Sequence, residues 1–337
     1  MRHVCIITTH PFWLEPLGCG TSLRSRYELL KSIATKVSVL FITHTDQSCP
    51  LPGGTLRMAD TGVQASHVAA IQQFVKDREV SLVYFSYDQF AGLARVLPCK
   101  TAVEIHDVMH LRQQQFEAFG YSFPVRVDAA QEISSLKCYD HVFAINASEA
   151  EYLQRQGVAQ AAYLPPAIPF RRIENGSGIW RFGLIASQAV PNRDGFEQIK
   201  PWLATTGPLV LAGPLAVADV AALSGHPSLT NLGVVDSPAD FYRCIDVALS
   251  PVRFGAGLKI KVLEALSCGK SVLATSHSIE GFPGGIERFV QIEDDLSAWN
   301  DRQLEAARDI DTRELAGWYQ EHFSPERVSD LLTAHLS

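Results

Sequence analysis

Residues 251–270 place glycines, basic residues and one acid at spacings that suit a bound anion. From Pro251 the chain reads Pro-Val-Arg-Phe-Gly-Ala-Gly-Leu-Lys-Ile-Lys-Val-Leu-Glu, ending at Glu264. Gly255 and Gly257 allow a diphosphate to approach the backbone closely. A helix expected over residues 258–267 would direct its unpaired N–H groups and its dipole at the same point. The segment therefore predicts a phosphate site between a strand and a helix.

Two charged side chains of this helix fall on one face with Gly257, at spacings of four and three residues. Lys261 would neutralise a phosphate, and Glu264 would accept hydrogen bonds from ribose hydroxyls. The alternative is a solvated Lys–Glu pair on an ordinary amphipathic helix, which contributes about a few tenths of a kcal/mol. The apolar stripe of the helix would consist of Leu258, Val262 and Leu266.

The elements that must position these residues alternate between short apolar runs and helical patterns, which predicts two α/β domains with parallel, doubly wound sheets. Ligands of such sheets bind at the carboxyl ends of the strands. In the first half, strands are expected at 4–9, 37–43, 82–86, 102–105 and 142–145, and helices at 22–33, 67–78, 89–96, 125–138 and 149–156. In the second half, strands are expected at 181–186, 209–212, 247–251 and 272–275, and helices at 194–203, 217–223, 239–244 and 258–267, before a mostly helical tail from 296 to 336.

Length and composition agree with two ordinary globular domains. The chain has 337 residues, of which 47% are hydrophobic and 19% charged. A proline-rich stretch at 164–169, followed by a Gly/Ser stretch at 175–178, is typical of a domain linker. The net charge is −7 and neither half is basic, which argues against nucleic acid as a partner.

The expected location is the cytoplasm, because no apolar run could span a bilayer and the N-terminus lacks the pattern of a signal peptide. No strongly basic amphipathic helix is apparent, so strong membrane attachment is not expected, and peripheral association stays open. The seven cysteines are scattered without a C-x-x-C pair. A zinc site or a disulfide framework is therefore not expected.

The glycine-rich motif resembles the donor-site signature of group 1 (family 4) glycosyltransferases of GT-B fold. That signature is matched by Arg-Phe-Gly-Ala-Gly, then Lys-Ile-Lys-Val-Leu-Glu-Ala-Leu, then Gly-Lys-Ser-Val-Leu-Ala-Thr. Further stretches resemble landmarks of the same family, and they lie at 104–108, 147–153, 182–195, 201–203 and 230–235.

The resemblance implies two Rossmann-like domains that face each other across a cleft. Residues 1–168 would form the N-terminal acceptor-side domain and residues 169–318 the nucleotide-sugar donor domain. Residues 319–337 would form a C-terminal helix that packs back on the N-terminal domain. The implied reaction is a retaining, metal-independent transfer of a sugar from a UDP- or GDP-sugar. No cofactor is implied besides the substrate nucleotide-sugar, because the departing phosphate takes the proton of the acceptor.

Site roles follow from the same resemblance. Glu264 would hold the donor ribose, Lys261 the phosphates, and Arg253 and Lys259 would add positive charge. The donor-binding set implied in full is Ser187, Asn192, Arg253, Gly255, Gly257, Leu258, Lys259, Lys261 and Glu264, together with Gly18 and Gly20.

Two departures from the family pattern bear on this set. Ala256 stands where many members carry an acid eight residues before the position of Glu264, so the sugar contact of that acid must come from another group. Ser187 and Gln188 stand where the family commonly has Arg and Lys, and Arg193 is a candidate substitute.

In the first half, His106 ends an apolar strand and is the candidate catalytic residue, because a histidine there can bond the donor sugar. The alternative is a structural histidine, with Asp107 as the N-cap of the next helix. His10, at the end of the first strand, is a lesser candidate.

The loop that carries Gly18 and Gly20 precedes Arg24 and Arg26. It would contact donor phosphate or acceptor. Alternatively, it simply begins a helix with Thr21 or Ser22 as cap.

Other readings stay open at this point. Asp309-Ile310-Asp311 suggests a metal-binding acid pair, but a solvated surface fits its helical surroundings better. The chain could also be a non-catalytic sugar-nucleotide-binding protein, or a sugar-nucleotide epimerase or phosphorylase of the same architecture. The acceptor is undetermined, and a saccharide, a lipid-linked glycan, a protein and a small molecule are all compatible with the sequence.

Overall fold

The computed structural model describes residues 2–14, 18–57, 65–174, 182–218, 223, 226–308 and 310–336. The chain divides into two compact units. The first consists of Met1–Glu15, Cys19–Ala167 and Val328–Ser337, and the second of Pro16–Gly18 and Ile168–Arg327.

The first unit is built on a seven-stranded parallel sheet in the order β3-β2-β1-β4-β5-β6-β7. Its strands are β1 (His3–Thr8), β2 (Lys36–Thr43), β3 (Gly53–Arg57), β4 (Leu82–Ser86), β5 (Lys100–Ile105), β6 (His141–Ala144) and β7 (Ala161–Tyr163). Its helices include α1 (Cys19–Ile33), α2 (Ala65–Asp77), η1 (Asp88–Phe90), α3 (Ala91–Ala94), α4 (Met109–Ala118), α5 (Ala129–Leu136) and α6 (Ala147–Arg155). The chain reverses its winding direction between β1 and β4, which is where open α/β sheets usually bind ligands.

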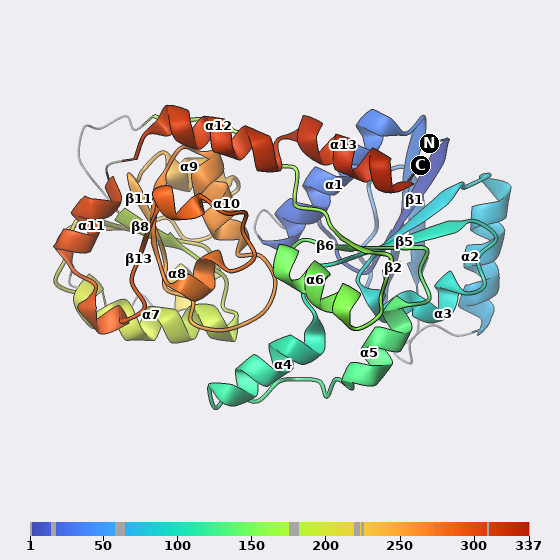
Figure 1. Ribbon diagram of the computed structural model, residues 1–337, viewed down its shortest axis with the longest axis horizontal. Helices are drawn as coiled ribbons and strands as arrows, with labels where there is room; N and C mark the ends of the chain where they lie inside the picture. The colour runs from blue at the N-terminus through green and yellow to red at the C-terminus, as the bar shows by residue number, and fades with distance from the viewer. Residues whose placement is uncertain are drawn as a thin grey trace. The chain divides into compact units, whose positions relative to one another are not determined.

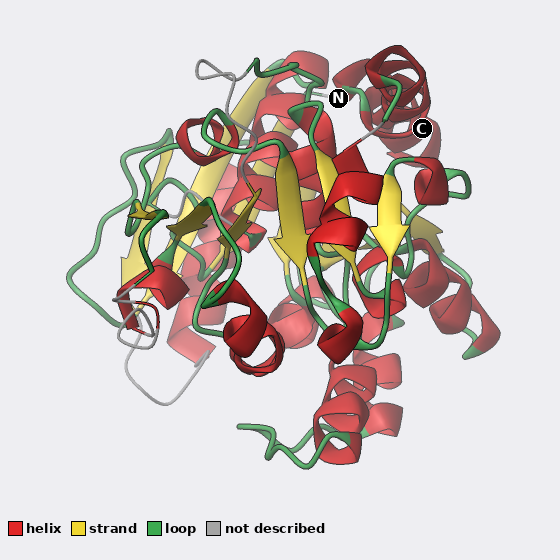
Figure 2. Ribbon diagram, turned by 90° about the vertical axis from the view of Figure 1, so that its left-hand side faces the viewer, coloured by secondary structure: helices red, strands yellow, loops and turns green. Residues whose placement is uncertain are grey.

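Continuous apolar runs form the inner strands because both faces of this sheet are covered. β1 and β4 are buried along their whole length. One apolar cluster includes Val83 and Ile105, and a second, on the other face, includes Leu82 and Leu30. Figures 1 and 2 show the strands side by side with helices on both sides.

The second unit has a six-stranded parallel sheet in the order β10-β9-β8-β11-β12-β13. Its strands are β8 (Phe182–Ile185), β9 (Leu209–Ala212), β10 (Leu229–Asn231), β11 (Val247–Ser250), β12 (Ser271–Ala274) and β13 (Val290–Ile292). Its helices include α7 (Val190–Leu203), α8 (Pro214–Ala218), α9 (Pro238–Tyr242), α10 (Ile260–Ser267), α11 (Asp301–Arg308) and α12 (Thr312–Phe323), with short turns η3 (Ser276–Ile279), η4 (Ile286–Arg288) and η5 (Leu296–Ala298).

Helix α7 packs closely against the end of β11. A Cβ atom added at Gly195 would lie 2.0 Å from the carbonyl oxygen of Pro251, so only glycine fits at this crossing. This contact places the first turns of α7 beside the loop that follows β11, where the sequence predicts the phosphate site.

The last helix, α13 (Pro325–Leu336), belongs to the first unit from Val328 onward. Val328 and Leu332 are fully buried in the apolar cluster that also contains Leu23 and Leu30 of α1. Burial of two branched apolar residues fixes this helix on the first unit.

The predicted fold class, two Rossmann-like α/β domains with parallel sheets, is confirmed. The expectation that the domains face each other across a cleft stays a prediction. Four strands, β3, β7, β10 and β13, and one helix, α4, were not expected from sequence periodicity alone. The strands are short or lie at sheet edges with half-exposed residues, and α4 buries only His110 and Phe116, so each lacks a clear apolar pattern. The Gly/Ser stretch at 175–178 lies outside the described residues.

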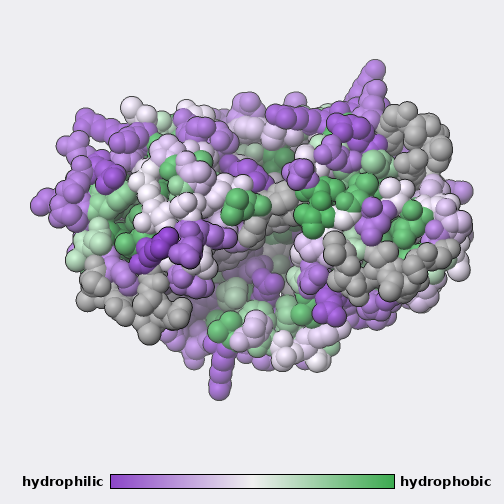
Figure 3. Space-filling model, turned by 180° about the vertical axis from the view of Figure 1, so that it is seen from behind, coloured by the Kyte–Doolittle hydropathy of each residue, from purple (hydrophilic) through white to green (hydrophobic). Residues whose placement is uncertain are grey.

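Hydrophilic residues predominate on the face seen in Figure 3, and the apolar residues there form separate small patches. Among the helices of the described residues, none is long and apolar enough to cross a bilayer.

Candidate active site

The loop between β11 and α10 has the backbone geometry of an anion site. Gly255 has a φ of 113° and Gly257 a φ of 71°, a region that side-chain-bearing residues rarely adopt. Both glycines are buried, and the loop leads directly into the first turn of α10. The sequence-based interpretation of these two glycines as loop formers agrees with this conformation.

Hydroxyl groups hold the start of this loop in place. Ser278 Oγ donates to the carbonyl oxygen of Ser250 at 2.7 Å, and Thr275 Oγ1 donates to that of Val252. Both hydroxyls are buried, so the loop carbonyls are satisfied without water. Sequence reasoning missed these two residues, although both follow strand β12, the neighbour of β11.

Arg253 forms a bidentate pair with Asp194 of α7. Its Nε lies 2.8 Å from Asp194 Oδ2, and its Nη2 lies 2.7 Å from Oδ1. The Asp194 side chain is 4% exposed and that of Arg253 is 32% exposed. The guanidinium fork is therefore used to join the loop to α7. Asp194 had no predicted role, and its position nine residues after the end of β8 carried no obvious signal.

Three predicted donor-site residues form one hydrogen-bonded chain. Lys261 Nζ donates to Asn192 Oδ1. Asn192 Nδ2 donates to Ser187 Oγ at 3.0 Å and to the Ser187 carbonyl oxygen at 3.2 Å. The structure thus brings together the end of β8, the start of α7 and the first turn of α10.

The ammonium group of Lys261 sits in surroundings that oppose its charge. Burial lowers its pKa to about 7, the charge of Lys259 acts in the same direction, and Glu264 opposes the shift. A lysine in this state gains from a bound anion, because the anion compensates the lost hydration. A phosphate near Lys261 would therefore raise its pKa and keep it protonated.

Glu264 is only 5% exposed, so it is not part of a solvated surface pair. The predicted stripe of Leu258, Val262 and Leu266 is buried, as expected. Almost all of α10 is buried, and Tyr242 donates from its hydroxyl to the carbonyl oxygen of Lys261 at 3.0 Å. The interpretation of α10 as an ordinary surface helix is wrong, because a carboxylate is kept inside only where it has a role or a partner.

Lys259 is placed differently from Lys261. Its Nζ donates to the carbonyl oxygens of Gly257 at 3.1 Å and Ala256 at 3.3 Å, which stabilises the glycine loop from within. Glu280 of the next strand–helix connection lies within electrostatic range of Lys259 and bonds His277 Nδ1 at 3.0 Å. Glu280 is an acid close enough to interact with Lys259, and sequence reasoning did not single it out.

In the first unit, His106 follows β5 and is 4% exposed. Its ring stacks on Tyr87, with ring centroids 4.8 Å apart, and its Nε2 lies 3.5 Å from Glu104 Oε1. Burial lowers the pKa of His106; Glu104 and Asp107 oppose this shift, and His10 adds to it. Tyr87 has a φ of 69°, a costly conformation for a residue with a side chain, at the end of β4.

Glu104 anchors a buried polar network beneath His106. Arg26 Nε donates to Glu104 Oε2 at 2.5 Å, and the Tyr84 hydroxyl donates to the same oxygen at 2.6 Å. Arg26 Nη2 also donates to the carbonyl oxygens of Leu164 and Pro165. The side chains of Arg26 and Glu104 are 1% and 0% exposed. Arg26 is therefore a structural residue rather than a phosphate ligand of the glycine loop.

The surroundings of Gly18 and Gly20 also correct the prediction. Gly18 has a φ of 59°, and Gly20 lies inside α1, which begins at Cys19. Thr21 and Ser22 are therefore helical residues and not caps. The assignment of Gly18 and Gly20 to donor or acceptor stays a prediction.

Hydrogen bonds show the structural roles of two acidic residues, Asp107 and Asp311. Val108, not Asp107, is the N-cap of α4, and Asp107 accepts from Arg112 Nη1 at 2.5 Å. Asp311 caps α12 by accepting from the backbone of Arg313 and Glu314. Asp309 lies outside the described residues.

Solved structures with the same fold span the whole chain. Sucrose-phosphate synthase from Thermosynechococcus elongatus superposes with a TM-score of 0.74 at 15% identity, covering 99% of this chain and 98% of the other. Anabaena HepE in complex with UDP gives a TM-score of 0.70 at 12% identity, with coverage of 100% and 99%. The lipopolysaccharide outer core galactosyltransferase WaaB, in its apo form, gives 0.63 at 13% identity, with coverage of 100% and 99%. The fold of this chain is therefore GT-B.

Residues 194–309, which include α7, the glycine loop and α10, match the family model described as glycosyl transferases group 1. No curated protein sequence is significantly similar to the chain. The match covers about a third of the chain, in the unit that carries the glycine loop, and agrees with the resemblance of that loop to the donor-site signature of this family.

Proposed function

We propose that the protein transfers a sugar, with retention of anomeric configuration and without a metal ion, from a UDP- or GDP-sugar to a hydroxyl acceptor. The main support for this proposal is the series of side-chain hydrogen bonds that joins Ser187, Asn192 and Lys261 beside the glycine loop. It places a lysine with a lowered pKa beside the N-terminus of α10, where a diphosphate gains both a cation and backbone N–H groups.

Glu264 supports a nucleotide rather than a simple phosphate. It lies one turn beyond the N-terminus of α10, on the same helix as Lys261. A buried carboxylate at this point suits the vicinal diol of a ribose, which donates two hydrogen bonds. Lys261 and Glu264 then recognise the two chemically different ends of a nucleoside diphosphate.

The proposed reaction needs no protein nucleophile. The bond between the anomeric carbon and the phosphate oxygen breaks, and the acceptor oxygen bonds to that carbon from the same face. The acceptor proton passes to the departing phosphate oxygen. The protein contributes orientation and stabilisation of the negative charge that grows on the diphosphate. Lys261, Lys259 and the N-terminus of α10 supply that stabilisation.

His106 is the proposed catalytic residue of the first unit. Because burial lowers its pKa, the imidazole is neutral near pH 7 and can both donate and accept hydrogen bonds. A neutral ring held between Tyr87 and Glu104 would bind a donor-sugar hydroxyl without adding charge.

Cytoplasmic location is proposed with the same function, since its nucleotide-sugar donor is a cytoplasmic metabolite class.

The proposal is tested by measuring release of UDP or GDP from a panel of nucleotide-sugars, with and without EDTA. We expect one donor to be turned over or slowly hydrolysed at the same rate in both conditions. Activity that is lost in EDTA and restored by Mn²⁺ or Mg²⁺ would contradict metal independence. Product with inverted anomeric configuration, determined by NMR, would contradict the retaining mechanism.

A further inference from the structure

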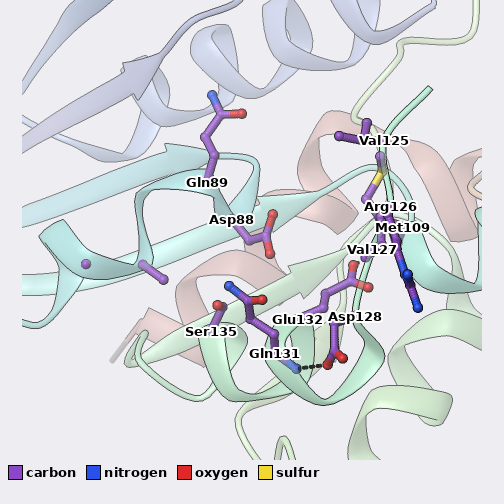
Figure 4. Close-up of a pocket in the computed structure, with 12 residues that line it drawn as sticks. Asp88, Gln89, Met109, Val125, Arg126, Val127, Asp128, Gln131, Glu132 and Ser135 are labelled. Atoms are coloured by element: carbon purple, nitrogen blue, oxygen red, sulfur yellow. Dashed lines mark hydrogen bonds between the residues drawn. The ribbon is translucent and has the colours of Figure 1, made fainter. Parts of the chain in front are cut away.

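The first unit contains a pocket that has no part in the sites described so far. Its volume is about 440 Å³, within the range of roughly 300–1,000 Å³ typical of small-molecule sites. It lies among η1, α3, the start of α4, the segment before α5 and α5 itself (Figure 4). All of these elements belong to the same compact unit, so the pocket is complete within it.

Most acidic groups in the lining are already engaged. Glu132 accepts hydrogen bonds from the backbone N–H groups of Met109 and His110 and from His110 Nδ1, at 2.7, 2.9 and 2.6 Å. Asp128 caps α5 by accepting from the backbone N–H of Gln131 at 2.8 Å. These bonds fix the walls of the pocket and leave little capacity for a ligand.

Asp88 differs from these two acids. Within the part of the chain that the structure describes, no other residue donates a hydrogen bond to its carboxylate. Figure 4 shows the carboxylate directed into the space beside Glu132, whereas Gln89 points away from it. Burial raises the pKa of Asp88 to about 6, and the charge of Glu132 acts in the same direction. A ligand that donates hydrogen bonds to Asp88 would therefore relieve a desolvated acceptor.

The remaining lining has two chemical characters. Gln131 and Ser135 can donate and accept hydrogen bonds, as a hydroxyl-bearing ligand requires. Apolar surface comes from the backbone and side chains of Ala91, Gly92, Met109, Val125 and Val127. A pyranose ring has the matching pattern, with hydroxyls at its rim and C–H groups on its faces.

We propose that this pocket binds an uncharged saccharide unit of the acceptor, with the Asp88 carboxylate accepting hydrogen bonds from two of its hydroxyls. This inference rests on the proposed transfer to a hydroxyl acceptor and names the class of that acceptor. Sugar acids are disfavoured, because Asp88, Asp128 and Glu132 outnumber the single basic residue of the lining, Arg126. The same charge balance would attract the ammonium group of an amino sugar, so glucosamine is included as the competing probe.

The experiment measures direct binding by saturation-transfer NMR and titration. The probes are neutral α- and β-linked hexose disaccharides, glucuronic acid and glucosamine, and UDP is titrated in parallel. Three variants of the full chain are compared with wild type. Asp88→Asn keeps the shape of the side chain and removes its charge.

Gly92→Leu fills the pocket, since a Cβ atom there meets no heavy atom within 4 Å and the backbone is not strained. Gly317→Leu is the matched control, because Gly317 lies on the exposed side of α12 with equally open surroundings.

We expect neutral disaccharides to bind wild type and Gly317→Leu equally. Asp88→Asn should weaken that binding by about ten- to a hundredfold, as expected for loss of a charge-assisted hydrogen-bond acceptor. Gly92→Leu should abolish it. UDP binding to the second unit should be unchanged in all variants, and an unchanged unfolding transition followed by circular dichroism shows that the first unit is folded.

The inference is overturned if no neutral disaccharide binds, if glucuronic acid or glucosamine binds in preference, or if Asp88→Asn and Gly92→Leu bind as wild type does. Failure of the proposed function gives a different result. If no nucleotide-sugar is turned over but saccharide binding is lost in both pocket variants, the saccharide site is supported and the proposed glycosyl transfer is rejected. If sugar transfer occurs and these variants keep the wild-type KM for the acceptor, the proposed transfer is supported and the assignment of the pocket to the acceptor is rejected.

Discussion

The two units carry the same kind of sheet but opposite chemistry at the ends of their strands. After β11, the second unit presents two left-handed glycines, Lys259 and Lys261 at the start of a helix. After β4, the first unit presents the carboxylate of Asp88 at the side of a pocket. The sheets serve as equivalent supports, and the residues that follow the strands decide whether an anion or a hydroxyl-rich ligand is favoured.

An arginine–carboxylate pair in each unit, Arg26–Glu104 in the first and Arg253–Asp194 in the second, allows a second comparison, because the two pairs differ in burial. Arg26 and Glu104 are 1% and 0% exposed, whereas Arg253 and Asp194 are 32% and 4% exposed. A fully buried pair can be broken only at the cost of leaving a charge without water. A half-exposed arginine can regain solvent when its partner is removed.

The largest expected effect tests this difference in burial. Glu104→Leu should lower the free energy of unfolding by about 3–5 kcal/mol, because Arg26 is left buried and unpaired. Asp194→Leu should cost less, about 1–3 kcal/mol, because Arg253 can be rehydrated. Urea denaturation followed by circular dichroism measures both. Equal losses in the two variants would show that burial does not distinguish the pairs, and a double variant that also replaces Arg26 with Leu should recover part of the loss.

The next largest effect is on the affinity of the second unit for its nucleotide. Glu264→Ala should weaken the binding of a nucleoside diphosphate by about ten- to a hundredfold, the usual value for a charge-assisted hydrogen bond. Glu305→Ala, on the exposed side of α11, is the matched control and should bind as wild type does. Calorimetric titration with nucleoside, monophosphate and diphosphate separates the contacts. A folded Glu264→Ala protein with wild-type affinity would remove Glu264 from the donor site.

The smallest effect is a pH dependence of diphosphate binding to the second unit. Without a ligand, Lys261 has a pKa of about 7 and is mostly neutral above that pH. Binding of a diphosphate raises this pKa, so Lys261 takes up a proton when the complex forms. Diphosphate affinity should therefore fall by up to about tenfold per pH unit between pH 7.5 and 9, where the phosphate itself is fully ionised. The affinity should level off below pH 7, where Lys261 is already charged.

Lys261→Ala should remove this pH dependence and should weaken diphosphate binding far more than nucleoside binding. Titration in buffers of different ionisation enthalpy counts the protons taken up. A slope that persists in Lys261→Ala would assign the titration to another group.

The sequence was sufficient for features encoded in one continuous stretch. Residues 247–267 contain strand β11, both left-handed glycines, Lys261 and Glu264, so their order along a strand, turn and helix follows from local rules. The apolar runs of β1, β4, β9 and β11 likewise predict a buried parallel sheet, because both faces of each strand must be covered.

Only the tertiary structure decided which charges remain available. Arg26 and Arg253 look equivalent in the sequence, as arginines beside glycine-rich turns. Arg26 is used internally because folding brings it to Glu104, 78 residues away, and Arg253 is joined to Asp194, 59 residues away.

The pocket beside Asp88 arises for the same reason. Its lining comes from three stretches of the chain, 88–92, 109 and 125–135, with no shared motif. Glu132 and Asp128 bind backbone N–H groups of other residues there, and within the described residues the Asp88 carboxylate does not. Hydrogen bonds and desolvation depend on distance in space, and local periodicity contains no information about partners far along the chain. The sequence therefore determined the elements and the donor motif, and the packing of those elements determined which side chains are left to bind.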